Sequence, residues 1–182
     1  MKAEATRLPE VRRVITQVFA DERGQFTETW RSDSYAQLGI GPFVQDNVSV
    51  SRRGVLRGLH LQHPLAQAKL VSVLRGVVFD VAVDVRVGSP TFGQWVGEEL
   101  SDDRGVQLFI PAGFAHGFVT LSDEVVFSYK CSTYYAPADE RTVLWNDPAI
   151  GIAWPIEKPI VSPRDAAARC LADIPTELLP RF

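Results

Sequence analysis

The chain has 182 residues, a length that favours one domain and is enough for a sizeable hydrophobic core. Hydrophobic residues make up 46% of it and charged residues 23%, as in ordinary soluble proteins, and the net charge of −3 gives no support to nucleic-acid binding. No apolar run approaches the roughly 20 residues of a membrane span, and the residues after Met1 do not resemble a signal peptide. Neither Cys131 nor Cys170 lies in a Cys-x-x-Cys pair, so we expect a reduced, cytoplasmic setting without membrane contact.

The first predicted element is a short helix over residues 32–38, with Ser32 or Asp33 as its N-cap. Strand patterns rich in Val, Phe and Leu follow at residues 48–51, 69–74, 77–85, 93–100, 107–110 and 125–129, separated by glycine and proline turns. Residues 136–163 contain five prolines and no clear period, so we expect them to wrap the surface, and a second helix is predicted over 166–172. Many short strands predict an all-β sandwich or barrel with few short helices, as one domain over residues 1–182.

The three histidines, His60, His63 and His116, raise the question of a metal site. Gly105 is followed after five residues by the segment Pro-Ala-Gly-Phe-Ala-His116, which resembles the second motif of the cupins, the double-stranded β-helix barrels of jelly-roll type. That motif closes with Asn, where this chain has Thr120. The resemblance implies a cupin barrel.

The first cupin motif is only partly present. Gly54 and His60 fit it, but Gln62 replaces its second histidine and Gln67 stands where its glutamate would be. Neutral amides are poor ligands for transition metals, and odd spacing would point His63 to the opposite face of a strand from His60. We therefore expect neither a metal nor another cofactor, and chemistry carried out by side chains.

His60 can be a structural histidine, a metal ligand or a general base. Arg57 precedes it by three residues and Lys69 follows it by nine, so a turn near residues 63–64 would let both cations line one pocket. A histidine can take a proton from carbon near neutral pH, and cations stabilise the oxyanion that forms beside it. We therefore predict proton transfer next to a ketone. For His116, positioning and direct catalytic roles are equally compatible with the sequence.

Linked motifs in the same order make the chain similar to the dTDP-4-dehydrorhamnose 3,5-epimerase family, over roughly residues 14–165. The matching segments are residues 19–28, 45–51, 54–62, 67–70, 75–84, 89–93, 110–118, 129–130, 134–137, 145–148 and 162–165. Two departures are Arg141-Thr142 where the family usually has Arg-Gly, and Val-Ser-Pro-Arg164 where Leu-Ser-x-Lys is usual.

The resemblance implies a thymidine-diphospho 4-keto-6-deoxy sugar as substrate and inversion of both carbons that flank the ketone. In it, His60 falls on the base and Asp165 on the carboxylate that orients the imidazole. Tyr129 falls on the acid that returns a proton from the other face, and Lys69 on the residue that steadies the enolate oxygen, with Arg57 as a helper.

The resemblance also implies binding roles and a homodimer, in which residues 23–28 cross to complete the neighbouring site. Diphosphate contacts are implied for Arg23 and Arg57, and packing against the thymine or sugar for Phe26 and Tyr135. The remaining implied contacts are to the nucleoside (Glu28, Gln45, Asn47) and to the sugar (Ser49, His116).

Other interpretations stay open. Taken singly, Phe26 could be core, Asp165 a helix N-cap and Tyr129 an ordinary strand aromatic; together with His60 in register they favour the functional interpretation. Within the fold, epimerisation of one centre only and 3,4-ketoisomerisation are alternatives, and the intact acid–base set disfavours the second. A non-catalytic nucleotide-sugar-binding cupin could dispense with the acid–base set, and a metal-dependent cupin oxygenase would need stoichiometric metal.

Overall fold

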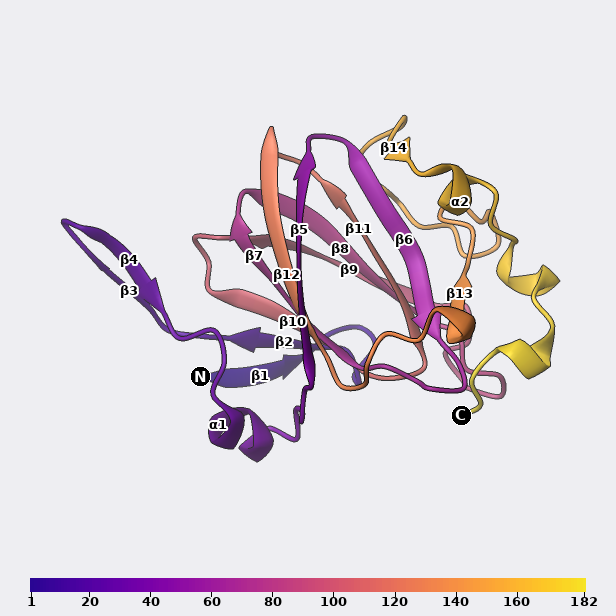
Figure 1. The fold of residues 1–182 in the computed structure, drawn as a ribbon, viewed down its shortest axis with the longest axis horizontal. Helices are drawn as coiled ribbons and strands as arrows, with labels where there is room; N and C mark the ends of the chain where they lie inside the picture. The colour runs from indigo at the N-terminus through magenta and orange to yellow at the C-terminus, as the bar shows by residue number, and fades with distance from the viewer.

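The computed structural model describes residues 1–182 and consists of two β-sheets packed face to face, with a hairpin projecting from one end (Figure 1). The first sheet contains, in spatial order, β1 (Lys2–Ala5), β2 (Arg12–Ile15), β10 (Val106–Ile110), β7 (Lys69–Arg75), β12 (Glu124–Cys131) and β5 (Gln45–Arg52). The second contains β13 (Glu140–Thr142), β6 (Val55–Gln62), β11 (Phe114–Thr120), β8 (Val77–Asp84) and β9 (Trp95–Ser101). The short β14 (Ile160–Val161) adds to β6 in parallel, whereas all other strand pairs are antiparallel.

The prediction of an all-β jelly-roll fold with few short helices is confirmed, and each predicted strand corresponds to one of β5, β7, β8, β9, β10 and β12. The strand predicted from Gly93 begins at Trp95, because Gln94 still belongs to the preceding turn and donates to the Thr91 carbonyl. Strands β1 and β2 escaped prediction because four residues of mixed polarity carry almost no alternation signal. Strands β6 and β11 also lie outside the predicted ranges; β11 is buried along its whole length and therefore shows no alternation.

The predicted N-cap of the first helix is wrong. Helix α1 (Ser32–Gln37) is where the sequence places it, but its N-cap is Arg31, and no side chain caps it. The carboxylate of Asp33 accepts a hydrogen bond from the next amide, that of Ser34, instead.

The predicted helix over residues 166–172 is also wrong. Helix α2 (Pro163–Ala166) is a single turn that begins earlier, because Ser162 caps it and Pro163 pre-forms its first position. The chain then leaves the helix because Arg169 forms a bridge with Val143 and Leu171 enters the core. Three 3-10 turns, η1 (Pro137–Asp139), η2 (Leu171–Asp173) and η3 (Thr176–Leu178), complete the helical structure.

Hydrophobic side chains fill three layers. Between the sheets lie residues such as Val71, Leu108, Phe118 and Phe127. The outer face of the second sheet is covered by the C-terminal segment from Ile150 to Leu179, and helix α1 covers part of the outer face of the first sheet. The part of that face near β5 stays uncovered, and there Val48 and Val50 are exposed.

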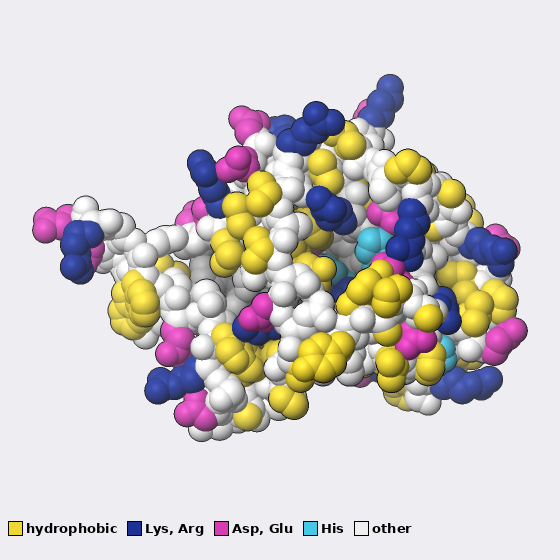
Figure 2. Space-filling model, viewed as in Figure 1, with side chains coloured by type: hydrophobic (Ala, Val, Ile, Leu, Met, Phe, Trp, Pro, Cys, Tyr) yellow, Lys and Arg dark blue, Asp and Glu magenta, His cyan; other side chains and the backbone are white.

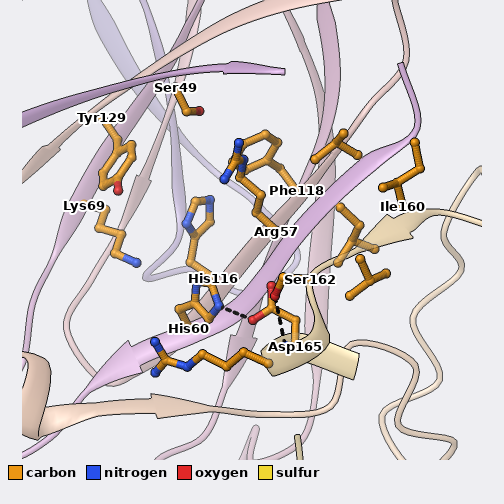
Figure 3. A pocket seen from close by; sticks show the side chains of 14 residues that line it. Ser49, Arg57, His60, Lys69, His116, Phe118, Tyr129, Ile160, Ser162 and Asp165 are labelled. Atoms are coloured by element: carbon orange, nitrogen blue, oxygen red, sulfur yellow. Dashed lines mark hydrogen bonds and ion pairs between the residues drawn. The ribbon is translucent and has the colours of Figure 1, made fainter. Parts of the chain in front are cut away.

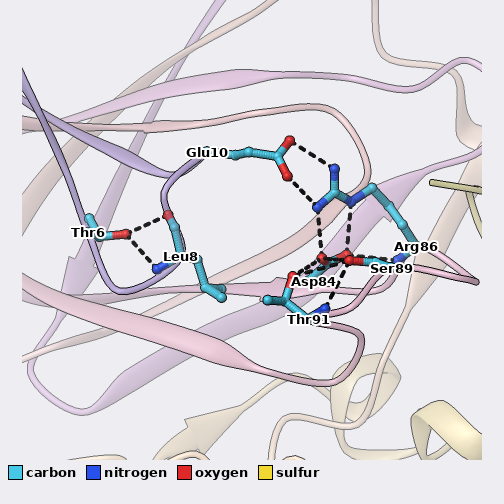
Figure 4. A network of polar contacts seen from close by, with 7 residues as sticks. All are labelled: Thr6, Leu8, Glu10, Asp84, Arg86, Ser89 and Thr91. Carbon is cyan, nitrogen blue, oxygen red and sulfur yellow. Dashed lines mark hydrogen bonds and ion pairs between the residues drawn. The ribbon is translucent and has the colours of Figure 1, made fainter.

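A buried polar network ties the N-terminal segment to the turn after β8 (Figure 4). The Arg86 guanidinium donates to the carboxylates of Glu10 and Asp84, and the hydroxyls of Ser89 and Thr91 also donate to Asp84. Burial alone would raise the pKa of Asp84, but these donors outweigh it and lower the pKa to about 2. The network is therefore a stable ionic link, and none of its members lines the cleft described next.

The hairpin of β3 (Val18–Asp21) and β4 (Gly24–Thr27), which we call the arm, pairs only with itself and extends away from both sheets (Figure 1). Phe19 and Phe26 face each other across it, and the Phe26 side chain is 68% exposed. An exposed aromatic pair on a projecting hairpin is typical of a surface that meets another molecule.

No helix of the structure combines the length and apolar character needed to cross a membrane.

Candidate active site

A cleft opens between the two sheets at one end of the sandwich. It consists of two adjoining cavities of about 440 and 310 Å³, and His60, Lys69 and Tyr129 line both. Figure 2 shows histidine side chains at the bottom of a hollow in the middle of the molecule, with cationic side chains around it. The cleft therefore gathers most of the residues that the sequence singled out.

Alternation along the strands of the first sheet places one wall of the cleft. Asn47 and Ser49 project inward from β5, because successive side chains of a strand point to opposite faces. Lys69 lies at the start of β7, and Tyr129 on β12 pairs with both Asn47 and Val71. The inward face of this sheet thus carries an amide, a hydroxyl, an ammonium and a phenol.

A β-bulge in β6 places the cationic part of the opposite wall. His60 pairs with His116 on β11, but Arg57 pairs with Phe118, so three steps along β6 match two along β11. The extra residue reverses the alternation, and Arg57 and His60 both line the larger cavity despite their odd spacing. Gly58 permits the bulge, since its φ is +128° and a Cβ there would lie 2.5 Å from the Cα of Gly117.

His60 and Asp165 form a hydrogen-bonded pair at the edge of the cleft (Figure 3). The His60 Nε2 lies 2.7 Å from the Asp165 Oδ1, and the Asp165 side chain is only 6% exposed. Helix α2 positions the carboxylate: the Asp165 amide donates to the Ser162 hydroxyl, and the Gly58 amide approaches the second carboxylate oxygen. Asp165 is thus inside the helix, not its N-cap.

The ionisation of Asp165 determines which nitrogen of His60 is free. Burial raises the pKa of Asp165, but hydrogen bonds from His60, the Gly58 amide and Ser162 outweigh this effect and lower the pKa below its ordinary value. The carboxylate is therefore ionised at neutral pH and accepts the proton on Nε2. The neutral imidazole then carries its lone pair on Nδ1, the nitrogen of a general base.

Tyr129 and Lys69 face His60 from the other sheet (Figure 3). Burial raises the pKa of the Tyr129 phenol, so it keeps its proton throughout the neutral range. Burial lowers the pKa of the Lys69 ammonium, which lies 5.9 Å from the centre of the Tyr129 ring. The cleft therefore presents a base on one wall, and a proton donor with an adjacent amine on the other.

His116 has a carboxylate partner that the sequence did not identify. Its Nε2 lies 2.9 Å from the Oδ2 of Asp80, a fully buried residue of β8. Burial raises the pKa of Asp80 and lowers that of His116. Both shifts disfavour the charged forms of these two side chains. The sequence contained one signal of this pair: Asp80 lies within the mostly apolar run 77–85, and a buried carboxylate needs a partner.

Gln62 and Gln67, which stand at cupin ligand positions, form hydrogen bonds with the backbone of nearby loops. Gln62 donates to the carbonyls of Leu65 and Tyr134 and accepts from the Ala136 amide, and Gln67 donates to the Thr133 carbonyl. His63 follows the end of β6 and lines neither cavity. Thr120, at the place of the motif's asparagine, bridges the Arg52 carbonyl and the Val55 amide. The structure contains no group of three or more His, Cys, Asp or Glu side chains suited to hold a metal ion.

The predicted binding residues divide into two sets. Arg57 donates to the Ser51 hydroxyl in the larger cavity, while Gln45, Asn47 and Tyr135 line the smaller one, where the Gln45 amide contacts Asn47. Arg23, Phe26 and Glu28 line neither cavity. Arg23 stands at the tip of the arm beside Asp21, so within one chain the arm residues are separated from the cleft.

Several residues of the cleft were not singled out in the sequence. They include the apolar wall of the larger cavity (Val55, Leu56, Phe118, Ile160, Val161), Arg164 in the same cavity, and Glu140 in the smaller one. Apolar wall residues carry no chemical signature in sequence, because they resemble any core residue.

Comparison with known proteins gives a consistent family. The family model described as dTDP-4-dehydrorhamnose 3,5-epimerase matches residues 5–173. Two curated proteins of that name, from Neisseria gonorrhoeae and Pseudomonas aeruginosa, are 52% and 50% identical over 92% and 95% of this chain. The chain spans 52% of the length of the Neisseria protein and 97% of the Pseudomonas protein.

Two further similarities concern the ligand and the reaction. A crystal structure of a dTDP-6-deoxy-D-glucose-3,5-epimerase from Legionella pneumophila in complex with dTDP-4-keto-L-rhamnose superimposes with a TM-score of 0.96 at 50% identity, covering 100% of this chain and 98% of that one. A dTDP-4-dehydrorhamnose 3-epimerase from Streptomyces niveus is 44% identical over 90% of this chain and 81% of its own. Overall similarity thus extends to a protein named for one centre only.

Proposed function

The chain belongs to the dTDP-4-dehydrorhamnose 3,5-epimerase family, and we propose that it converts dTDP-4-dehydro-6-deoxy-D-glucose into dTDP-4-dehydro-L-rhamnose by inverting C3 and C5. The observation that carries this proposal is the pair of opposed groups in the cleft: the His60–Asp165 base on one sheet, and the protonated Tyr129 beside Lys69 on the other. An epimerase needs a base and an acid on opposite faces of one carbon, and this cleft supplies both.

Proton removal is the first step at each centre. The Nδ1 of His60 takes the proton from the carbon beside the ketone, the C–H electron pair forms a C=C bond, and the carbonyl becomes an enolate. Asp165 stabilises the resulting imidazolium through the hydrogen bond to Nε2. The Lys69 ammonium steadies the enolate oxygen, with Arg57 as a helper, in a cleft whose partly apolar lining strengthens such interactions relative to bulk water.

Proton return from the opposite face completes the inversion. The enolate electrons take a proton from the Tyr129 hydroxyl, the C=O bond re-forms, and the configuration at carbon is reversed. The phenol holds its proton throughout the neutral range and is therefore available as the donor.

Replacing Tyr129 by Phe separates the two steps. We expect Tyr129→Phe to slow net epimerisation by about a hundredfold, the typical contribution of one general acid, while His60 still exchanges the substrate C–H with solvent. Proton NMR in deuterated water measures exchange and product in one sample. Tyr134→Phe is the matched control, since its side chain is exposed and outside both cavities. Equal loss of exchange and epimerisation in Tyr129→Phe would contradict the assigned role.

Substrate binding is assigned to the walls around this centre. Arg57 takes the diphosphate through its planar guanidinium, and Ser49 and His116 contact the sugar. The base-binding residues are those of the smaller cavity: Gln45 and Asn47 for hydrogen bonds and Tyr135 for packing.

A homodimer completes the site in this proposal, with Arg23 and Phe26 of the arm, and Glu28 directly after it, entering the neighbouring cleft. Three features support it: the arm projects from the sandwich, Phe26 is exposed, and Val48 and Val50 leave an apolar strip uncovered on β5. A reduced cytoplasmic setting is also part of the proposal, in keeping with the two free cysteines.

Mixing two inactive variants tests whether the arm acts on the neighbour. An arm variant with Arg23→Ala and Phe26→Ala lacks the arm contacts, and His60→Ala lacks the base. If the arm acts on the partner, a mixed dimer contains one intact cleft, so an equal mixture should recover roughly a quarter of the wild-type rate per chain. No recovery after mixing and refolding would mean that the arm serves its own cleft or none.

Product stereochemistry tests the reaction itself. The product should show inverted configuration at C3 and C5 by NMR coupling constants and should be accepted by a reductase specific for dTDP-4-dehydro-L-rhamnose. A product inverted at one centre alone would assign the chain to the single-centre alternative, in the manner of the Streptomyces niveus relative. Tight binding without any product would favour the non-catalytic interpretation.

A further inference from the structure

The segment that enters the arm is tied to the sandwich at Thr16. The Thr16 amide and hydroxyl both donate to the Gly105 carbonyl at 2.8 Å. Gly105 permits this close approach, since its φ is +61° and a Cβ there would lie 2.7 Å from the Val18 side chain and 3.1 Å from the Thr16 hydroxyl. The arm, which begins at Val18, therefore starts close to a fixed point.

The segment that leaves the arm is held by a buried pair that we call the anchor, Tyr35 on α1 and Gln107 on β10. The Gln107 Nε2 donates to the Thr29 carbonyl at 2.9 Å and to the Ser72 hydroxyl at 2.7 Å. The Tyr35 hydroxyl donates to the Gln107 Oε1 at 2.6 Å and also lies 2.9 Å from the Thr29 carbonyl oxygen. The backbone directly after Glu28 is thus fixed by two side chains that are distant in sequence.

The anchor lies inside the molecule. Tyr35 is 1% exposed and Gln107 is 5% exposed. Burial raises the pKa of Tyr35 to about 12, so its hydroxyl keeps the proton that it donates. A buried polar atom left without a partner costs free energy, so these contacts restrain the Thr29 carbonyl strongly. Neither residue of the anchor lines the cleft, so any effect on the reaction must pass through the segment that the anchor holds.

Beyond its two attachments the arm has little support. Its strands pair only with each other, and the arm extends away from both sheets (Figure 1). A two-stranded hairpin is only marginally stable by itself. The side chain of Gln25 adds one hydrogen bond to the Asp102 carbonyl, at an exposed position. The direction in which the arm presents Arg23 and Phe26 is therefore set mainly where it joins the sandwich.

We propose that Tyr35 and Gln107 are positioning residues that act across the dimer: they preset the direction of the arm before it enters the neighbouring cleft. The inference rests on the proposed function and on the homodimer within it. A binding element that is ordered beforehand loses less entropy when the ligand binds. The anchor therefore acts on substrate affinity in the partner's cleft and leaves proton transfer there unchanged.

Gln107→Met keeps the length of the side chain and removes the hydrogen bonds of its amide. We expect it to raise KM about tenfold at nearly unchanged kcat, because the loosened arm must be ordered at each binding event. Tyr35→Phe and Thr16→Val each remove one hydroxyl at almost constant volume and should raise KM less. Ser89→Ala is the matched control: it also removes a buried hydrogen bond, that to Asp84, and should lower the melting temperature without changing KM.

Mixed dimers, formed by refolding two variants together, determine in which cleft the anchor acts. With an excess of His60→Ala, nearly every Gln107→Met chain has its intact cleft completed by a normal arm, so KM should return to the wild-type value. The reverse mixture combines wild type with an excess of chains that carry both Gln107→Met and His60→Ala. There the intact cleft receives a loosened arm, and KM should rise to that of Gln107→Met.

The test is steady-state kinetics of these variants and mixtures with the dTDP-4-keto sugar, together with thermal melting. Support requires a raised KM in Gln107→Met and the two opposite shifts in the mixtures. A KM that stays raised in the first mixture and normal in the second would mean that the anchor acts on its own cleft, and would overturn the proposal. Wild-type KM in both Gln107→Met and Tyr35→Phe, or a loss of kcat alone, would overturn it as well.

Two further outcomes have defined consequences. If Gln107→Met does not fold, Tyr35→Phe takes its place in both mixtures, with the same opposite shifts expected. A wild-type protein that is inactive or monomeric would instead contradict the proposed function.

Discussion

His60→Ala should abolish exchange of the protons beside the ketone while nucleotide binding survives. We expect a loss of at least about a thousandfold, because the variant leaves the Asp165 carboxylate at that place, and its lowered pKa makes it a much weaker base than the imidazole. Binding should persist because the groups assigned to the diphosphate and nucleoside, Arg57, Gln45 and Asn47, lie elsewhere in the two cavities.

Deuterium uptake by NMR and calorimetric titration with dTDP measure the two properties separately. His63→Ala is the matched control, because that histidine follows the end of β6 and lines neither cavity. If His60→Ala retained exchange within tenfold of wild type, another group would have to be the base.

Asp165→Asn should have the second largest effect, a fall in kcat of about a hundred- to ten-thousandfold. The ionised carboxylate accepts the proton of His60 Nε2 and leaves the lone pair on Nδ1. An amide can donate to Nε2 instead, which favours the tautomer with its proton on Nδ1 and without a base facing the substrate; this change is costly in other histidine–aspartate pairs.

The rate of Asp165→Asn and the ¹⁵N shifts of its imidazole check this explanation. Asp173→Asn is a control at an exposed carboxylate on η2. The pKa of Asp165 is lowered in the folded state, so the stabilisation from its contacts is present above the ordinary carboxyl pKa and is lost only as pH falls through the lowered value. Wild-type kcat in Asp165→Asn would remove the carboxylate from the mechanism.

Much of the fold could be predicted from the sequence, because buried strands between glycine and proline turns leave a clear pattern. Some strands that escaped, such as β1 and the arm, are short or pair outside the sandwich, so their side chains lack the alternation of a half-buried surface. Two long strands of the second sheet also escaped: the bulge interrupts the alternation of β6, and β11 is buried at every position. The second helix was misplaced because three consecutive alanines suggest helix, whereas the bridge of Arg169 with Val143 sets the actual path.

The site was predictable to the extent that it depends on residue types in motifs. That Arg57 and His60 share a cavity despite odd spacing is due to the bulge in β6, which needs knowledge of the pairing with β11. The partnership of His116 with Asp80 and the link from Glu140 to Arg164 join strands and loops that are distant in sequence. Such contacts arise from packing and leave no local pattern.

The most direct test of proton transfer by side chains alone uses chelator-treated protein and the dTDP-4-keto-6-deoxy sugar in deuterated water. Proton and carbon NMR then report the label at each carbon of the product. Our account predicts deuterium at both C3 and C5, at a rate that the chelator does not change. Label at neither carbon, or a rate that depends on added metal ion, would contradict it.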